Sequence, residues 1–339
     1  MTTLDAASSS PSAGFWAGAT DAFGLAQQVL FEQLVQPLMF ALGLGNLLED
    51  AYRGTGWLLV GLLQIALLVT VVGALQRWRP VEPVTDRRAV RVDVIYTLVH
   101  RLGLFRLGLF FTLEPLAWAL IGELRLLGVR PWQLDALWPG VTDTALLSFV
   151  LYLLLFDFVD YLIHRGQHQW HWWWQLHALH HSQRQMTMWS DNRNHLLDDV
   201  LRDLVFVAVG LALGVGPGQF VAIVAFTQLV ESLSHANVRM SFGPLLGRLL
   251  VSPAYHRLHH RIGLGHESAG PGSLGGHNFA VLFPMWDHLF GTARHDGRYE
   301  PTGIRDQLPA DGARQGGRDY GQGFWSQQWL GLKRLAGRG

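Results

Sequence analysis

The sequence predicts an all-α fold, namely a multi-span helical membrane protein with a cytosolic cap that is rich in histidine. Of the 339 residues, 49% are hydrophobic and 15% are charged, which is less charge than is usual in a soluble protein. Apolar runs long enough to form membrane helices recur along the chain. Fifteen of the 16 histidines lie between His164 and His295, and their motifs follow the apolar runs.

The composition excludes several classes of function. The formal net charge is zero with histidine neutral, and the chain has no basic block, so nothing indicates a nucleic-acid partner. Cysteine is absent, which excludes disulfides, iron–sulfur ligation and thiolate chemistry. Among the 26 basic residues only Lys333 is a lysine, a bias typical of a GC-rich bacterial genome.

The N-terminal region is expected to be polar at first and then partly apolar. The segment MTTLDAASSSPSAGFWAG contains Asp5 and no early Lys or Arg, so we do not expect a secretory signal peptide. The stretch Val29–Leu48 is apolar but includes Glu32 and Pro37. Residues 1–56 are therefore predicted to be a polar tail followed by an amphipathic or partly inserted helix.

The clearest membrane-crossing helix begins at Trp57 and ends at Leu75. These residues, WLLVGLLQIALLVTVVGAL, carry no charge, and at 1.5 Å per residue they span roughly 28 Å, close to a bilayer core. The following segment is rich in arginine, so the positive-inside rule predicts that it is cytoplasmic. Its arginines are Arg77, Arg79, Arg87, Arg88 and Arg91.

Two further apolar regions complete the predicted transmembrane part, residues 57–143, and begin the next domain. One runs from Leu104 to Ile121 and is interrupted by charged residues and a proline, and the other runs from Thr144 to Ile163. If both cross the membrane, the chain leaves and returns, and His164 emerges on the cytoplasmic side. Multi-pass insertion in a bacterial inner membrane is the expected localisation.

A pair of shorter apolar segments lies further along the chain. Val205–Val215 and Gln219–Val230 flank the sequence Gly216-Pro217-Gly218. Each segment is short for a full span, so we expect a helical hairpin that enters and returns. The hairpin would bring His235 back to the side of the other histidines.

Nine histidines form a series with helical spacing. Residues three and four apart share a helix face, so each motif is expected to present its imidazoles from one face. Imidazole is the commonest side-chain metal ligand at neutral pH, and nine nitrogens exceed what one ion binds, so two neighbouring metals are predicted. The nine candidate ligands are His164, His168, His177, His180, His181, His235, His256, His259 and His260.

Simpler interpretations compete with this one. A solvated histidine-rich tract is the main alternative, but such tracts have low complexity, whereas this series contains two copies of H-x-x-H-H about 80 residues apart. Isolated histidines are expected to be ordinary surface or core residues. These are His100, His171, His266, His288 and His295.

Four tryptophans, Trp170, Trp172, Trp173 and Trp174, lie among the candidate ligands. Tryptophan is enriched at the membrane–water boundary, where its ring is apolar and its N–H can stay hydrated. They place the histidine cap at the level of the lipid headgroups. The alternative is that they are core residues.

The ligand types narrow the chemistry. Zinc hydrolases need a general base, typically the Glu of H-E-x-x-H, whereas Arg165 and Gly166 follow His164. A structural zinc site would favour cysteines, which are absent. Neutral nitrogen ligands suit redox-active iron, which can bind and activate oxygen.

The series of histidine motifs resembles the fatty acid hydroxylase (sterol desaturase-like) superfamily of membrane di-iron oxygenases. The segment DFVDYLIHRGQH resembles the family pattern D-x-x-x-Y-x-x-H-R, and HALHHS (residues 177–182) matches its second histidine box. Arg193 and His195 match a downstream R-x-H. NFAVLFPMWDHLFGT (residues 278–292) resembles the closing N-Y-G…W-D-x-x-F-G-T signature, with Phe279 and Ala280 as departures. The resemblance covers about Thr144–Arg298.

The resemblance implies that residues 144–298 form a di-iron catalytic domain, with 299–339 as a polar C-terminal tail. It implies that the nine histidines bind two iron ions, and zinc is the alternative in an isolated or inactive form. Such a centre uses O2 to hydroxylate or desaturate an unactivated C–H bond of a sterol-like, fatty acyl or related lipid in the bilayer. Because no G-x-G-x-x-G motif follows a strand, electrons are expected from a separate donor.

Some residues are secondary candidates. Asp160 lies one helical turn before His164 and is expected to orient a ligand imidazole through its second nitrogen. Glu231 lies one turn before His235 and is a candidate for the same role or for ligation, and it resembles the Q/E-x-x-x-H helix of some branches of the family. His195 and His277 are further candidate ligands. Asp287 is expected to brace the C-terminal fold.

Two other classes of protein remain as alternatives. A membrane zinc hydrolase would hold zinc and consume neither oxygen nor reductant. A non-enzymatic metal carrier or haem-binding protein is the second, but carriers place acidic or histidine residues inside spans, and haem needs only one or two axial histidines.

Overall fold

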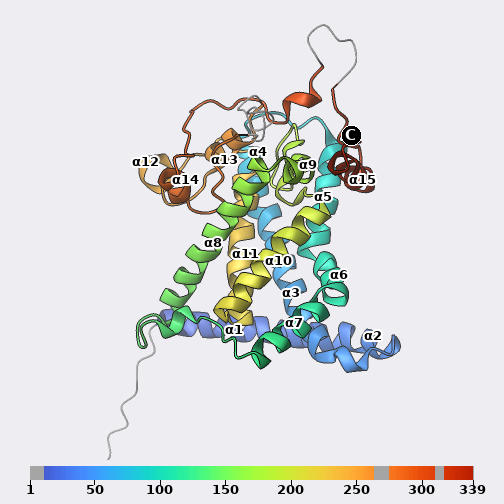
Figure 1. Cartoon of the computed structure of the whole chain (residues 1–339), viewed down its shortest axis with the longest axis vertical. Helices are drawn as coiled ribbons and strands as arrows, with labels where there is room; N and C mark the ends of the chain where they lie inside the picture. Colours follow the sequence, from blue (N-terminus) through green and yellow to red (C-terminus); the bar gives the residue numbers. More distant parts are fainter. Residues whose placement is uncertain (1–10, 263–274, 310–316, 339) are drawn as a thin grey trace, which may run out of the picture. The chain divides into compact units, whose positions relative to one another are not determined.

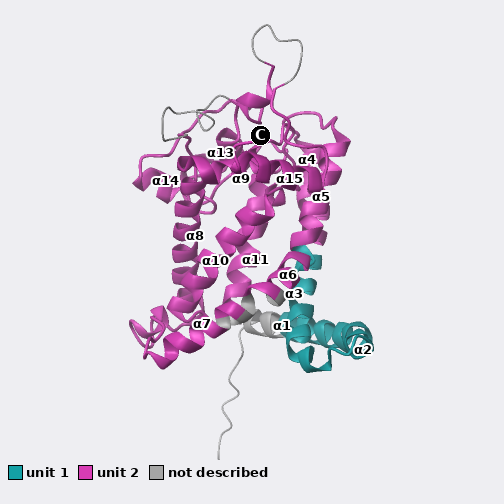
Figure 2. Ribbon diagram, turned by 45° about the vertical axis from the view of Figure 1, so that its right-hand side comes forward, with its two compact units in different colours: residues 1–63, 101–103 teal, residues 64–100, 104–339 magenta. Residues whose placement is uncertain are grey.

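The computed structural model describes residues 11–262, 275–309 and 317–338 (Figure 1). Helices make up the regular structure of these ranges, which contain no strand, and an isolated bridge pairs Arg261 with Thr302. The predicted all-α fold is confirmed for this part of the chain. The chain divides into two compact units, residues 1–63 with 101–103, and residues 64–100 with 104–339 (Figure 2).

The first unit contains three helices. They are α1 (Pro11–Leu30), which continues through a π-helical turn (Phe31–Val35) into α2 (Gln36–Ala41), and the first part of α3 (Leu48–Leu67). The stretch Val29–Leu48 is thus divided, because α2 ends at Ala41 and Gly43 adopts a left-handed φ of 72°. Phe31 packs edge-on against Tyr52 with 5.2 Å between the ring centroids.

Two helices are long and apolar enough to cross a membrane. One is the continuous helical segment Gly45–Trp78, which includes α3, a second π-helical turn (Leu68–Val72) and α4 (Gly73–Trp78). The other is α8 (Ala145–Gln169). The first contains the predicted span 57–75, and α8 contains all of the predicted span 144–163 except Thr144, which caps it. Both helices extend beyond the predicted ends. Their length and composition indicate association with a membrane.

The expected span between Leu104 and Ile121 is not a single helix. After α5 (Arg87–Arg101), the chain forms α6 (Leu104–Thr112) and then α7 (Glu114–Leu126). Pro115 lies in the first turn of α7, where proline is tolerated because its missing N–H would have no partner within the helix. Each helix is too short to cross a bilayer core alone.

The predicted apolar hairpin is present as α10 (Leu196–Leu213) and α11 (Pro217–Ser234). Gly214 ends α10 in the left-handed region, with φ 63° and ψ 34°, a conformation that glycine adopts at little steric cost. The hairpin packs against α8 through aromatic rings, and the Phe156 ring lies 5.5 Å from that of Phe206 and 5.6 Å from that of Phe220. The helix pair that returns the chain to His235 is therefore fixed to the helix that carries His164.

The arginine-rich segment after α4 lies at the same end of the second unit as the histidines. Gln76 accepts hydrogen bonds from the backbone N–H groups of Met188 (3.0 Å) and Asn237 (2.8 Å). Asn237 in turn accepts from the N–H groups of Val81 and Glu82. The expectation that the arginines and His164 share one side is thus supported by direct contacts, although the intervening chain does not contain the expected span.

The remaining helices form this end of the second unit. They are α9 (His171–His181), α12 (Gly243–Leu246), α13 (Pro253–His259), α14 (Met285–Leu289) and α15 (Phe324–Leu335), with short 3-10 turns at 190–192 and 305–307. A further 3-10 turn at 134–136 packs against α8 near its start. Figure 1 shows α9, α13 and α15 near the C-terminal end of α8. The expected polar tail therefore contains a packed helix, α15, whose side chains Gln327 and Gln328 are buried.

Close packing of α3 against the last residue of α5 gives a first prediction. A Cβ atom at Gly61 would lie 1.7 Å from the backbone oxygen of Arg101, whereas one at Gly54, in the same helix, would meet no atom within 4 Å. Gly61→Ala should lower stability by about 1–3 kcal/mol through overpacking, and Gly54→Ala should leave it unchanged or raise it by up to about 1 kcal/mol. Thermal unfolding of the detergent-solubilised variants measures this, and equal midpoints for the two variants would contradict the packing.

Candidate metal centre

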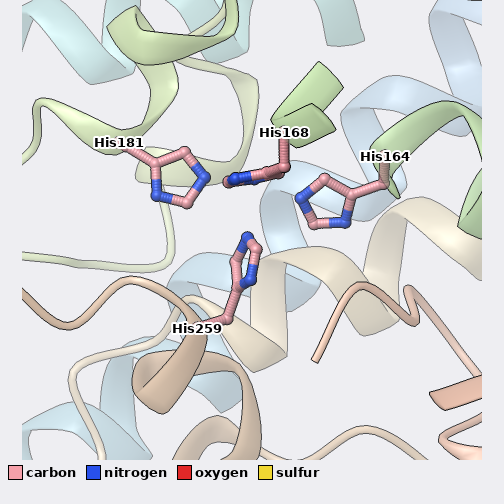
Figure 3. A group of neighbouring side chains, drawn as sticks. All are labelled: His164, His168, His181 and His259. Carbon is pink, nitrogen blue, oxygen red and sulfur yellow. The ribbon is translucent and has the colours of Figure 1, made fainter. Parts of the chain in front are cut away.

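Four histidines from three helices surround one point in the second unit. His164 and His168 come from α8, His181 from the end of α9 and His259 from α13. One nitrogen of each lies within 4.8 Å of the corresponding atoms of the others. Figure 3 shows the four rings directed toward a common space. We call this set the first histidine group.

A second group of four adjoins it. It consists of His180 from α9, His235 at the end of α11, and His256 and His260 from α13, again with one nitrogen each within 4.8 Å of the others. The Nε2 atom of His235 lies 3.1 Å from that of His180 and 3.0 Å from that of His256. The two groups touch where the rings of His181 and His260 stack, with 4.2 Å between their centroids.

The two H-x-x-H-H motifs divide their histidines between the groups. His180 and His181 are adjacent in α9 but belong to different groups, and the same holds for His259 and His260. Successive residues of a helix point about 100° apart, so a pair of adjacent histidines reaches two centres at once. The expectation that each motif presents one face is correct for α8 and wrong for α9 and α13.

All nine predicted ligands are buried, with exposures between 0 and 7%. Burial lowers the pKa of His180, His256 and His260 well below the usual range, and the neighbouring histidines lower it further. The same burial lowers the pKa of His235. These rings are therefore neutral at physiological pH, which is the form that binds a metal.

Backbone carbonyls fix the orientation of three ligand rings. His164 Nδ1 lies 2.8 Å from the oxygen of Phe279, His259 Nδ1 2.7 Å from that of His277, and His235 Nδ1 2.8 Å from that of Glu231. A carbonyl can only accept, so each Nδ1 carries the proton and each Nε2 presents its lone pair to the group. This is the arrangement in which metal-binding histidines are held in proteins.

The donor set fits metal ions better than it fits a protein hydrogen-bond network. The Nε2 atom of His164 is buried and has no hydrogen-bond partner. In the second group Nε2 atoms approach one another at 3.0–3.1 Å. Converging lone pairs repel unless a cation lies between them, and nitrogen ligands of one metal, each about 2.0–2.1 Å from it, are separated by such distances.

Asn278 holds the two carbonyls that orient His259 and His164. It lies between His277 and Phe279 and has a φ of 58°, in the left-handed region that asparagine tolerates better than most residues. Its side chain donates to the oxygens of Tyr255 and Arg294 and accepts from the Arg294 N–H. Asn278 thus helps to set the direction of the His277 and Phe279 carbonyl groups, which orient two ligands of the first group.

The closing motif is braced by two buried aspartates. Asp287 accepts from the N–H groups of Phe279 and Ala280 and from the hydroxyls of Tyr255 and Thr292. The expectation that Asp287 braces this segment is confirmed. Asp157 of α8 accepts from the N–H groups of Leu282 and Phe283 and from Trp286 Nε1. Together they hold the motif against the helix that carries His164.

His177, the ninth candidate, lies between the groups and belongs to neither. Its ring centroid is 5.0–5.2 Å from those of His164, His168, His180 and His181. Its Nδ1 atom lies 3.2 Å from Asp198 Oδ2, and its Nε2 atom is buried without a hydrogen-bond partner. Asp198 also accepts from Gln167 and Trp173 Nε1. The geometry leaves His177 Nε2 available to an ion in either group.

The secondary carboxylates do not act as expected. Asp160 accepts two hydrogen bonds from Arg202, at 2.9 and 2.5 Å, and therefore does not orient His164. Glu231 forms an ion pair with the same arginine at 3.3 Å. It does orient His235, but through its backbone oxygen and not through its carboxylate. The arginine attracts both carboxylates, which are the stronger acceptors for a guanidinium.

The two additional candidate histidines also differ from expectation. His195 is the N-cap of α10, where its Nδ1 accepts from the Leu197 N–H and its Nε2 lies 2.9 Å from the oxygen of Gln328. Both of its nitrogens are occupied, so the prediction of His195 as a ligand is wrong for this structure. His277 contributes its carbonyl oxygen to His259, and its side chain belongs to neither group. His266 lies outside the described residues.

A cavity of about 50 Å3 opens onto both groups. Histidines of each group line it, together with the ion-paired residues Asp160, Arg202 and Glu231. This volume suffices for one or two water molecules. The histidines thus face a small polar space that can hold a small molecule next to bound metals.

Several residues at this site carry no signal in the sequence. The carbonyls of Phe279 and His277 support ligands whatever their side chains are, so only the tertiary fold identifies them. Arg202 lies in an apolar helix far along the chain from its partner Asp160. Asp198 could have been suspected, because buried acids near histidine motifs often hold a ligand ring.

Comparison with known proteins identifies relatives with a shared chemistry. Residues 149–292 match the family model described as fatty acid hydroxylase. The ornithine lipid hydroxylase OlsE of Rhizobium tropici is 27% identical over 238 residues, which cover 70% of this chain and 67% of the relative. The alkylglycerol monooxygenases of Caenorhabditis elegans and Homo sapiens are 27% and 29% identical, over 44% and 40% of this chain.

The chain spans only 28% of the length of these two alkylglycerol monooxygenases. No solved structure matches it. The relatives are hydroxylases and monooxygenases, which are oxidoreductases, so the predicted enzyme class is confirmed. The resemblance that the histidine motifs predicted is confirmed as well.

Metal content tests the division into two groups. We expect one metal ion in each group of the parent protein. His168→Ala removes a nitrogen from the first group and His260→Ala one from the second, so each variant should retain about one metal ion per chain where the parent should bind about two. The double variant should bind none. The exposed His171, changed to alanine, is the matched control. Elemental analysis after loading with Fe(II) gives the result, and loss of both ions from each single variant would show one coupled site.

The conformation of Asn278 gives a separate prediction. Asn278→Ala keeps the left-handed φ at a cost of about 1–2 kcal/mol and removes the side-chain hydrogen bonds, whereas Asn278→Gly removes the same bonds without that strain. The alanine variant should therefore lose metal from the first group at a lower chelator concentration than the glycine variant. Equal chelator resistance of both variants and the parent would show that Asn278 does not support metal binding by the first group.

Proposed function

We propose that the protein is a membrane di-iron oxygenase that hydroxylates an unactivated C–H bond of a membrane lipid, since residues 149–292 match the fatty acid hydroxylase family. Two adjoining groups of four buried histidines are the observation that carries the proposal. Its relatives are hydroxylases and monooxygenases, which favours hydroxylation over desaturation. The nine histidines His164, His168, His177, His180, His181, His235, His256, His259 and His260 are the proposed ligands.

Iron suits the two groups better than zinc. Catalytic zinc keeps three protein ligands and an open fourth position, so four histidines would complete its tetrahedral shell. Iron takes up to six ligands, and four imidazoles leave positions for small molecules. When bound, two irons would supply activation of O2 and removal of hydrogen from the lipid, with electrons from a separate donor.

The chain's own residues orient and shield this centre. The carbonyls of Phe279, His277 and Glu231 hold three rings with Nε2 toward the groups, and Asp198 holds His177. Arg202 keeps the carboxylates of Asp160 and Glu231 in ion pairs. The burial of all nine rings excludes bulk water, which protects reactive species from side reactions.

The structure argues against the zinc hydrolase alternative. A hydrolase needs a carboxylate that can act as a general base. Five carboxylates line the cavity. Asp160 and Glu231 pair with Arg202, and Asp198 accepts from three side chains. Asp191 accepts from the Ser232 hydroxyl, and an Asp199 oxygen lies 3.4 Å from His100 Nε2. These partners occupy oxygens with which a general base would accept a proton from water.

We also propose the orientation in the membrane. Gly45–Trp78 and α8 cross the bilayer, and α6, α7 and the hairpin α10–α11 pack within or beside it. The arginine-rich segment lies at the end that carries the histidines, and arginine-rich segments remain on the cytoplasmic side. The histidines then lie at the cytoplasmic face of a bacterial inner membrane.

Oxygen and reductant consumption test the proposed reaction. The protein, purified without oxygen and loaded with Fe(II), should consume both when given a chemical reductant and membrane lipid extract, and mass spectrometry should find a lipid product that has gained one oxygen atom. The His168→Ala/His260→Ala double variant is the inactive control. A product that has lost two hydrogens would indicate desaturation, and a hydrolysed lipid formed without oxygen uptake would overturn the proposal.

A further inference from the structure

Helix α15 (Phe324–Leu335) has its polar and apolar faces reversed relative to a helix of a water-soluble protein. Its buried face consists of Gln327, Gln328, Gly331 and Arg334. Its exposed face carries Trp325, Trp329 and Leu332, which are 76%, 59% and 41% exposed. These three residues, at i, i+4 and i+7, form one stripe. Such a helix is stable when its outer face contacts an apolar medium.

The polar face is fixed in place by specific contacts. Gln328 donates to Tyr96 Oη and to the oxygen of Asn194, its Oε1 accepts from the Leu196 N–H, and its carbonyl lies 2.9 Å from His195 Nε2. A Cβ at Gly331 would lie 2.3 Å from His195, which shows how closely the helix approaches. Rotation of α15 to bury the tryptophans would break these contacts, so the stripe must remain outside.

A second pair of exposed tryptophans lies across a hollow from the C-terminal end of α15. Trp170 and Trp172, at the junction of α8 and α9, are 54% and 48% exposed, whereas Trp173 and Trp174 are buried. The expectation that all four tryptophans lie at the membrane boundary therefore fits Trp170 and Trp172 only. A hollow of about 700 Å3 joins this junction to the C-terminal end of α15, and Trp170, Trp172 and Arg334 line it. We call Trp170, Trp172, Trp325, Trp329 and Leu332 the tryptophan face.

The two chain segments that carry the tryptophan face have charges of one sign. Residues 169–175 and 320–338 contain no Asp or Glu, whereas the second segment contains Lys333, Arg334 and Arg338. The Lys333 ammonium lies 5.6 Å from the centroid of the Trp329 ring. Tryptophan combined with lysine and arginine is the composition of helices that lie in the headgroup region of anionic membranes.

The position along α8 agrees with this composition. The apolar helix ends at Gln169, and Trp170 follows directly. A helix of 25 residues spans roughly 37 Å, more than the bilayer core of about 30 Å, so its end emerges among the headgroups. Helix α15 packs against α9, which begins at that point.

We propose that the tryptophan face lies in the headgroup region of a bilayer that contains anionic lipids, with α15 as an interfacial helix. The proposal rests on the membrane placement of α8 in the proposed function and not on its chemistry. The polar face of α15 holds His195, the N-cap of α10. Contact of α15 with lipid therefore stabilises the helix whose Asp198 supports His177.

The absence of cysteine in the chain allows a direct test. Single cysteines at Trp325, Trp329, Gln322 and Val150 are labelled with an environment-sensitive fluorophore, and each labelled full-length protein is reconstituted into phosphatidylcholine vesicles with or without phosphatidylglycerol. Gln322 is an exposed position just before α15, and Val150 is an exposed position in the middle of the apolar part of α8. Quenching is measured with aqueous iodide and with lipids that carry a nitroxide.

Labels at 325 and 329 should be quenched by nitroxide lipids and should show a several-fold lower iodide quenching constant than the label at 322. Phosphatidylglycerol should increase this protection, and Lys333→Gln with Arg338→Gln should remove the increase. Iodide quenching at 325 and 329 equal to that at 322, with the label at 150 in lipid, would overturn the interfacial helix alone. Iodide access at 150 as well would overturn the membrane placement of α8.

Discussion

The convergence of neutral imidazoles in a buried space is the constraint on which the rest of the structure depends. Each ring must be neutral, and the lone pair of a chosen nitrogen must point inward, although this places like dipoles in contact. The chain achieves this by giving the other nitrogen a fixed acceptor, as the oxygens of Phe279, His277 and Glu231 do for His164, His259 and His235. Because these acceptors belong to the backbone, the position of the loops and helix ends determines the ligand geometry.

The closing motif shows how far this dependence extends. Asn278, in its left-handed conformation, directs the two neighbouring carbonyls, and Asp287 fixes the N–H groups of Phe279 and Ala280. Asp157 connects the same loop to α8. Four N–H groups of this loop would otherwise be buried without acceptors, so removal of either carboxylate costs more than the hydrogen bonds alone. The motif is distant in sequence from the histidines and yet determines where two of them point.

The sequence predicted the helical class, the two long apolar helices, the hairpin and the nine histidines, because these depend on local composition and spacing. It did not predict how the adjacent pairs His180–His181 and His259–His260 divide between two centres, since that depends on how three helices cross. It assigned Asp160 to the metal site because Asp160 lies one helical turn before His164, and His195 because it matches the R-x-H pattern of the family. Arg202 and Gln328 are their actual partners, and both come from helices whose approach only the tertiary structure reveals. The inverted faces of α15 were missed because its composition alone reads as a polar tail.

The carboxylates around the histidines determine the charge of the site. Nine neutral ligands would do nothing to neutralise the two divalent cations proposed for this site, and such charge in a buried site must be balanced nearby. Carboxylates that line the cavity provide negative charge close to the histidines. They are Asp160, Asp191, Asp198, Asp199 and Glu231, and Arg202 is the arginine among the lining residues. Carboxylates that lie near bound cations without ligating them offset the cations' charge. They also leave the remaining coordination positions open to small molecules, as an oxygen-activating centre requires.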